Sequence, residues 1–148
     1  MFASLQSVRD VPPTFLQTAV ATDAWSVKSP RGLVLIDDDS AFRTIMRAFA
    51  QSRGIQLDAF ESLQSMGSIG ALGKYSVAIV DYELGKMNGV EIAQYIPSLF
   101  KELPMVLISG RSRSATQQDP WPRCIKKFVH KDCGPDAIID EALQLLRR

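Results

Sequence analysis

Cysteine and histidine are scarce in this chain, which has two cysteines and one histidine among its 148 residues. Cys124 and Cys133 are too few for a disulfide framework, and their spacing is not that of a zinc site. A low cysteine content without a disulfide framework is typical of proteins that work in a reducing compartment, so we expect a cytoplasmic protein. His130 has no second ligand candidate near it in the sequence, and we interpret it as a surface or edge residue.

A large charge imbalance and long apolar runs are also missing. The formal net charge is +1, from 17 basic and 16 acidic residues, whereas binding to nucleic acid usually requires a strongly basic surface. No run approaches the roughly 20 apolar residues of a membrane-spanning helix, and the amino terminus does not resemble a signal peptide. We therefore expect no direct binding to nucleic acid or membrane.

The chain divides into an extension and one domain. Prolines interrupt residues 1–30, and we expect an N-terminal extension that is part helical or disordered. In residues 31–148, apolar runs alternate with helix-period segments, which indicates βαβ units and a doubly wound α/β sheet of five parallel strands. The predicted strands are 33–37, 55–60, 77–81, 105–109 and 126–131. The predicted helices are 40–52, 61–72, 89–100 and 136–146, with a shortened fourth helix within the proline-containing segment 110–122.

Polar side chains of different kinds follow these apolar runs. They are Asp37 and Asp38, Asp81, Ser109 and Lys131. The carboxyl ends of parallel strands share one edge of a sheet, where ligands bind. Carboxylates about 4 Å apart would repel one another by about 4 kcal/mol per pair, and Mg²⁺ is the cation that best suits such oxygen ligands. With a nearby ammonium group, this set suits phosphoryl transfer to a carboxylate.

Five segments in this order resemble the receiver domains of two-component response regulators. The resemblance covers Leu33 to Leu146 and implies a flavodoxin-like (βα)5 fold with strand order 2-1-3-4-5. The segments that carry it are LVLIDDD, VAIVD, MNG, PMVLISG and KKFVHK.

The resemblance also implies a role for each matching residue. Asp81 would be the phosphoacceptor, with Lys131 and Ser109 as its catalytic partners, and Ser109 and Phe128 would form the switch that responds to phosphorylation. The implied Mg²⁺ ligands are Asp37, acting through water, Asp38, Asp81 and the backbone carbonyl of Glu83.

The family implies a signalling function and not that of a classical enzyme, because phosphorylation and dephosphorylation are self-catalysed. The phosphoryl donor would be a histidine kinase or a histidine phosphotransfer protein. No output domain follows the last predicted helix, so we expect a stand-alone receiver that contacts a downstream protein. Whether it forms a homodimer stays open.

Two other functions remain as alternatives. The chain departs from the family pattern after Lys131, where the family usually has a proline and this chain has Asp132, which leaves the direction of Lys131 open. A pseudo-receiver that binds partners without phosphorylation is therefore one alternative. The other is a phosphatase of the haloacid dehalogenase type with Asp37 as nucleophile and Asp39 as acid, although the chain is short for that fold.

Overall fold

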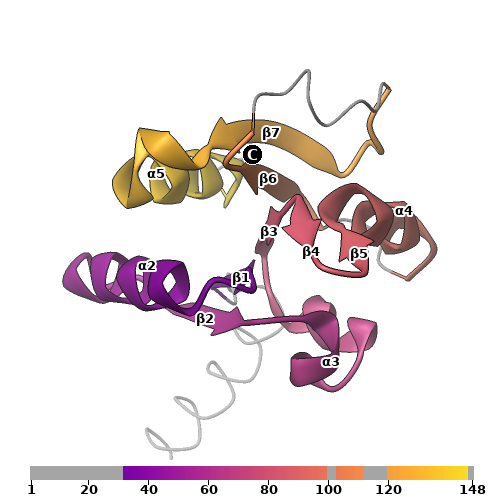
Figure 1. Cartoon of the computed structure of the whole chain (residues 1–148), viewed down its shortest axis with the longest axis horizontal. Helices are drawn as coiled ribbons and strands as arrows, with labels where there is room; N and C mark the ends of the chain where they lie inside the picture. The colour runs from indigo at the N-terminus through magenta and orange to yellow at the C-terminus, as the bar shows by residue number, and fades with distance from the viewer. Residues whose placement is uncertain (1–31, 100–102, 112–119, 147–148) are drawn as a thin grey trace, which may run out of the picture. The chain divides into compact units, whose positions relative to one another are not determined.

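The computed structural model describes residues 32–99, 103–111 and 120–146. These residues form a five-stranded parallel sheet, surrounding helices and a two-stranded antiparallel sheet (Figure 1). The elements are β1 (Leu33–Ile36), α2 (Ser40–Ser52), β2 (Leu57–Phe60), α3 (Leu63–Met66), the 3₁₀ helix η1 (Ile69–Lys74), β3 (Val77–Asp81), β4 (Glu83–Leu84), β5 (Met87–Asn88), α4 (Gly89–Leu99), β6 (Met105–Ser109), β7 (Ile125–His130), the 3₁₀ helix η3 (Lys131–Cys133) and α5 (Pro135–Leu146). The predicted extension over residues 1–30 lies outside the described residues, as does most of the segment predicted to hold the shortened fourth helix.

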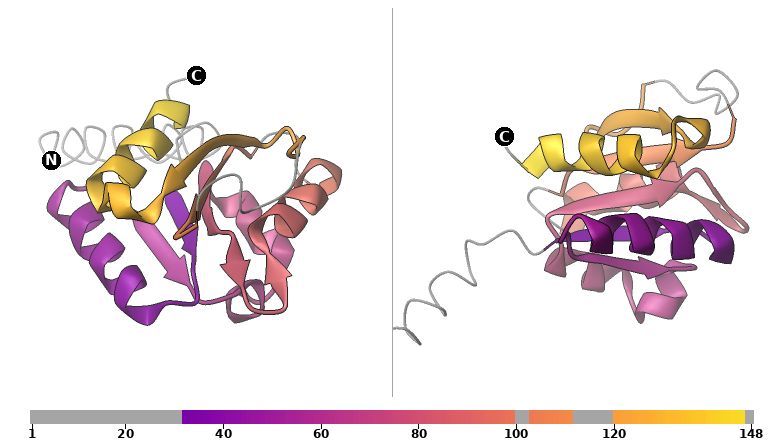
Figure 2. Two further views of the ribbon diagram at one scale, coloured as in Figure 1. Left: turned by 45° about the horizontal axis from the view of Figure 1, so that its top comes forward. Right: turned by 90° about the vertical axis from the view of Figure 1, so that its left-hand side faces the viewer.

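The large sheet has the strand order β2-β1-β3-β6-β7. Counting its five strands along the chain, this is the predicted order 2-1-3-4-5, so the prediction of a doubly wound, flavodoxin-like fold is confirmed. Helices α2 and α5 cover one face of the sheet, and α3, η1 and α4 cover the other (Figure 2). Within the described part of the chain, no helix has both the length and the apolar character needed to cross a membrane.

Alternate residues of the central strands supply two separate hydrophobic cores. Because successive side chains of a strand point to opposite faces, Leu33 and Leu35 of β1 pack on the α2 and α5 side, whereas Val34 and Ile36 pack on the other side. All four side chains are fully buried. Burial on both faces explains why these strands appear in the sequence as continuous apolar runs.

Helix α2 begins where the acidic segment ends. The Asp39 side chain caps the helix by accepting hydrogen bonds from the backbone N of Ala41 at 3.0 Å and of Phe42 at 3.2 Å. Near its other end, Arg53 forms ion pairs with two aspartates of α5, the shorter with Asp140 at 2.6 Å. The cap defines where α2 begins beside the carboxyl edge of the sheet, and the exposed ion pairs link its other end to α5.

The prediction of one continuous helix over residues 61–72 is wrong. Helix α3 ends after one turn because Gly67 adopts a φ of 102°, a backbone conformation that other residues rarely adopt. The chain then forms the 3₁₀ helix from Ile69 to Lys74. Gly67 therefore divides the predicted helix.

Several strand ends and one connection also differ from the prediction: β1 ends at Ile36 and β2 begins at Leu57. Strand β7 ends at His130, so Lys131 opens a 3₁₀ helix instead of closing the strand. The residues after β3 form the antiparallel pair β4–β5, where a plain loop was expected, and Gly85 makes its turn with a φ of 73°. A two-residue strand is too short to give a periodic sequence signal, which explains why the pair could not be predicted.

Candidate functional site

Three carboxylates come together at the carboxyl edge of the sheet. Asp37 and Asp38 directly follow β1, and Asp81 is the last residue of its neighbour β3. One carboxylate oxygen of each lies within 4.8 Å of the others. Asp37 and Asp81 are buried, whereas Asp38 is exposed to solvent. The parallel pairing of β1 with β3 places the two buried carboxylates next to each other.

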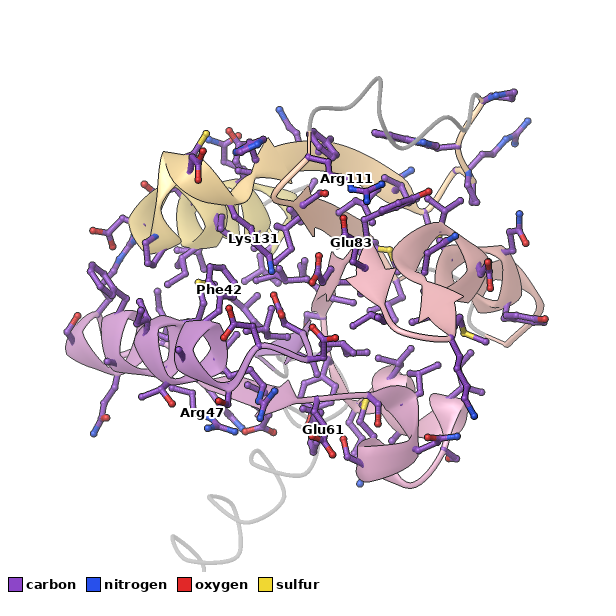
Figure 3. All side chains as sticks on the ribbon, in the orientation of Figure 1. Phe42, Arg47, Glu61, Glu83, Arg111 and Lys131 are labelled. Carbon is purple, nitrogen blue, oxygen red and sulfur yellow. The ribbon has the colours of Figure 1, made fainter. Side chains whose placement is uncertain are left out.

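Lys131 reaches this acidic cluster from the turn after β7. Its Nζ lies 2.7 Å from Asp37 Oδ2 and 3.1 Å from Asp81 Oδ2. The same Nζ lies 4.7 Å from the centre of the Phe42 ring, and Figure 3 labels both side chains, Phe42 on α2 and Lys131 in the turn after β7. Burial acts to lower the pKa of Lys131, but hydrogen bonds and charge from Asp37 and Asp81 outweigh burial and raise the pKa above its usual range. Lys131 is therefore a fixed positive charge at neutral pH.

Asp81 carries an incompletely balanced negative charge. Burial, followed by the charge of Asp37, raises its pKa from 3.8 to about 6, against the opposing effects of Lys131 and of a hydrogen bond from the Glu83 backbone N. One ammonium group therefore does not fully compensate the buried carboxylate pair. A cluster of oxygen donors with excess negative charge fits a hard divalent cation such as Mg²⁺.

Backbone contacts hold the two buried aspartates in place. Asp37 Oδ1 accepts a hydrogen bond from Asp39 N at 2.9 Å, and Arg43 Nη1 donates to the Asp37 carbonyl at 2.7 Å. On the other strand, Asp81 Oδ1 accepts from Glu83 N at 3.2 Å. Each carboxylate is thus oriented by groups that follow it in the sequence.

Gly89 allows the chain to pass close to Asp81. A Cβ atom at this position would lie 2.7 Å from the Asp81 carbonyl oxygen and 2.7 Å from Leu107 Cδ1, which is closer than real contacts allow. The Gly89 N donates to the Tyr82 carbonyl at 3.0 Å. A larger residue here would displace the end of β3 that carries Asp81.

An open pocket of about 550 Å³ lies over the acidic cluster. Among the residues that line it are Asp38, Asp81, Lys131, Glu83 and Arg111. Glu83 Oε1 and Arg111 Nε form an ion pair of 2.7 Å, and both side chains are more than half exposed (Figure 3). This pair links the segment after β3 with the segment after β6 at the side of the pocket.

The Glu83–Arg111 pair was not predicted, although the sequence contains a signal for it. Glu83 lies two residues after Asp81, and Arg111 lies two residues after Ser109. Because β3 and β6 are parallel neighbours, equal offsets beyond their ends bring opposite charges together. The contact of Phe42 with Lys131 was also missed, and it has no comparable signal because helical spacing marks Phe42 only as a core-facing residue.

Neither of the two predicted switch residues is among the described residues that line the pocket. Ser109 is fully buried at the end of β6, where its Oγ accepts a hydrogen bond from Arg111 N at 3.0 Å. Phe128 is partly buried on β7, and the centre of its ring lies 5.7 Å from that of Trp121. The structure places both residues, and their role as a switch remains a prediction.

The family of this chain follows from a match to a known protein family. The model of the response regulator receiver domain matches residues 33–143, which is most of the chain and includes the acidic cluster and Lys131. The chain belongs to the response regulator receiver family. Receiver domains are in general phosphoaccepting signalling modules and not classical enzymes, and the match favours neither of the alternative functions.

Individual proteins are similar in sequence to part of the chain. It is 30% identical over 88 residues to the photosynthetic apparatus regulatory protein RegA of Rhodobacter capsulatus, covering 60% of this chain and 48% of RegA. It therefore spans about half the length of that relative. It is also 23% identical over 118 residues to the chemotaxis protein CheY1 of Helicobacter pylori, covering 77% of this chain and 94% of CheY1.

Solved structures support the same fold. The response regulator TrrA of Thermotoga maritima, crystallised in complex with Mg²⁺-BeF, gives a TM-score of 0.64 at 22% identity and covers 76% of this chain and 96% of its own. The receiver domain of NtrX from Brucella abortus gives a TM-score of 0.66 at 21% identity, covering 78% of this chain and 98% of its own. At these identities the likeness establishes the fold alone.

Proposed function

We propose that this receiver accepts a phosphoryl group on Asp81 in a Mg²⁺-dependent reaction, and that the donor is a histidine kinase or a histidine phosphotransfer protein. The observation that carries the proposal is the position of the Asp81 carboxylate. It is buried, yet it lines an open pocket, with the Lys131 ammonium 3.1 Å away and two further carboxylates beside it.

In the transfer step, a carboxylate oxygen of Asp81 attacks the phosphorus of the donor. A bond forms between this oxygen and phosphorus, and the bond from phosphorus to the donor nitrogen breaks, with the electron pair leaving on the donor. Lys131 neutralises charge on the phosphoryl oxygens, and this positioned charge supplies most of what such a reaction requires. With a pKa of about 6, Asp81 is mainly ionised at neutral pH and available as the nucleophile.

The acidic cluster would hold the metal. The ligands would be the side chains of Asp38 and Asp81 and the backbone carbonyl of Glu83, with Asp37 acting through water. A bound Mg²⁺ would supply positive charge to the phosphoryl oxygens and would relieve the repulsion between Asp37 and Asp81.

Phosphorylation would be transmitted through Ser109 and Phe128. The Ser109 hydroxyl would donate to a phosphoryl oxygen and draw its loop inward, and Phe128 would follow. The output would be contact with a downstream protein in the cytoplasm, without direct binding of nucleic acid or membrane, and a homodimer is one form that the active protein could take.

The proposal is tested by incubating the protein with Mg²⁺ and acetyl phosphate and recording its intact mass. The wild type should gain one phosphoryl group, and EDTA should prevent the gain. Asp81→Asn should gain none, while the matched control Asp39→Asn, which removes a nearby exposed carboxylate and keeps a side chain able to cap α2, should react like the wild type. Equal modification of Asp81→Asn and the wild type would overturn the proposal.

A further inference from the structure

The turn that carries Lys131 is built without a proline. Lys131–Cys133 forms a 3₁₀ helix in which the His130 side chain accepts a hydrogen bond from Asp132 N at 3.1 Å. The turn closes with Gly134, which has a φ of 93° and donates from its N to the Lys131 carbonyl at 3.1 Å. The backbone of Lys131 is therefore fixed, but its four-carbon side chain must still be directed to the acidic cluster.

Two carboxylates share the ammonium group of Lys131. Asp37 and Asp81 compete for it, and the distance to Asp37 Oδ2, 2.7 Å, is the shorter of the two. A lysine side chain also loses rotamer entropy when it is held in one conformation. A further contact beside Asp81 would limit the freedom of the lysine side chain.

The ring of Phe42 is placed to provide that contact. Lys131 Nζ lies 4.7 Å from the ring centre, within the roughly 6 Å over which a cation is attracted to an aromatic face. The ring is itself held, because Phe42 packs against the core formed by α2, α5 and the sheet. The backbone N of Phe42 also donates a hydrogen bond of 3.2 Å to the Asp39 side chain that caps α2. A fixed ring thus borders a charged and otherwise flexible side chain.

We propose that Phe42 is a positioning residue for Lys131, and that the face of its ring keeps the ammonium group within reach of both Asp81 and the incoming phosphoryl group. This inference rests on the proposed function, since it concerns the same site. In a turn without the usual proline, the aromatic contact and the His130 hydrogen bond together direct the lysine. Phe42 touches no reacting atom and acts through Lys131 alone.

Kinetics with a conservative replacement separate this role from ordinary core packing. Phe42→Leu keeps an apolar side chain but removes the ring, and Phe42→Tyr restores a ring. With Mg²⁺ and acetyl phosphate, Phe42→Leu should be phosphorylated about three- to tenfold more slowly, and Phe42→Tyr should recover most of the rate. The Mg²⁺ concentration that gives half of the maximal rate should change less than about twofold, because the expected metal ligands remain.

Phe49→Leu is the matched control. It makes the same substitution on the same helix, at a residue that is 38% exposed, and its rate should equal that of the wild type. A second readout does not depend on activity: in the NMR spectrum, the Lys131 side-chain methylene protons should show a ring-current shift that disappears in Phe42→Leu and returns in Phe42→Tyr. If circular dichroism shows that Phe42→Leu does not fold, Phe42→Met takes its place.

Three results would overturn the inference while the proposed function stands. They are a wild-type rate in Phe42→Leu, no recovery in Phe42→Tyr, or an equal loss of rate in Phe49→Leu. If the wild type itself is not phosphorylated on Asp81, both proposals fail together.

Discussion

Replacing Asp81 with asparagine should stabilise the metal-free protein while removing its proposed function. The folded state raises the pKa of Asp81 from 3.8 to about 6, so it favours a neutral group at this position. A group with a raised pKa contributes its full stability below the lower value and loses it as the pH rises through the higher one. Asparagine is neutral at every pH and avoids that loss.

The size of the effect follows from the shift. About two pKa units correspond to about 3 kcal/mol in the free energy of unfolding once the pH is well above 6. For a domain of this size, such a change raises the melting temperature by about 10 °C. The advantage of Asp81→Asn over the wild type should therefore be largest at pH 7.5, shrink as the pH falls from about 6 to about 4, and vanish only below about pH 3.

Urea unfolding in EDTA, followed by circular dichroism at several pH values, measures this difference. Asp39→Asn serves as the control with the same change in net charge, and it should stay within about 0.5 kcal/mol of the wild type because asparagine caps helices as well as aspartate does. Adding Mg²⁺ should stabilise the wild type and reduce the difference between its free energy of unfolding and that of Asp81→Asn. Equal stability at pH 7.5, or a gap that does not vary with pH, would refute the reasoning.

Three further predictions concern other parts of the structure. Gly89→Ala should lower the free energy of unfolding by about 1–3 kcal/mol, because its Cβ would lie 2.7 Å from the Asp81 carbonyl oxygen; an unchanged urea midpoint would show that the chain can move aside at no cost. Arg111→Ala should slow phosphorylation by acetyl phosphate about two- to fivefold, because it leaves the Glu83 carboxylate uncompensated beside the pocket, and adding Glu83→Gln should restore the rate; a slow double variant would contradict this. Burial and a hydrogen bond to an aspartate of β2 raise the pKa of Tyr75 from 10 to about 12, so stability should fall between pH 10 and 12 in the wild type, and an identical fall in Tyr75→Phe would exclude this cause.

The fold could be predicted because its strongest signals are local. Strands such as Val77–Asp81 are buried on both faces, and they stand out in the sequence as apolar runs between helix-period segments. The convergence of Asp37 and Asp81 also follows from the sequence, since parallel strands end at a common edge. Gly67, in contrast, could be recognised as weakening a helix, but helical spacing does not show whether a glycine stays in the helix or leaves it with a positive φ, as Gly67 does at 102°.

The parts of the site that escaped prediction depend on contacts between distant segments. The distance between Lys131 Nζ and the Phe42 ring is set by how α2 packs beside the turn after β7. The Glu83–Arg111 pair requires the exact ends of two neighbouring strands, and strand ends are the least certain feature of a sequence-based prediction. The sequence shows that Asp132 follows Lys131 where the family pattern has a proline. It does not show the hydrogen bond from Asp132 N to His130 that shapes the turn.

The central claim, that Asp81 is the phosphoacceptor, is tested most directly by locating the modified residue. After reaction with Mg²⁺ and acetyl phosphate, reduction with borohydride converts an aspartyl phosphate to homoserine, which peptide mass spectrometry identifies by position. The account predicts homoserine at position 81 alone. Homoserine at position 37 or 38, with position 81 unchanged, would contradict it.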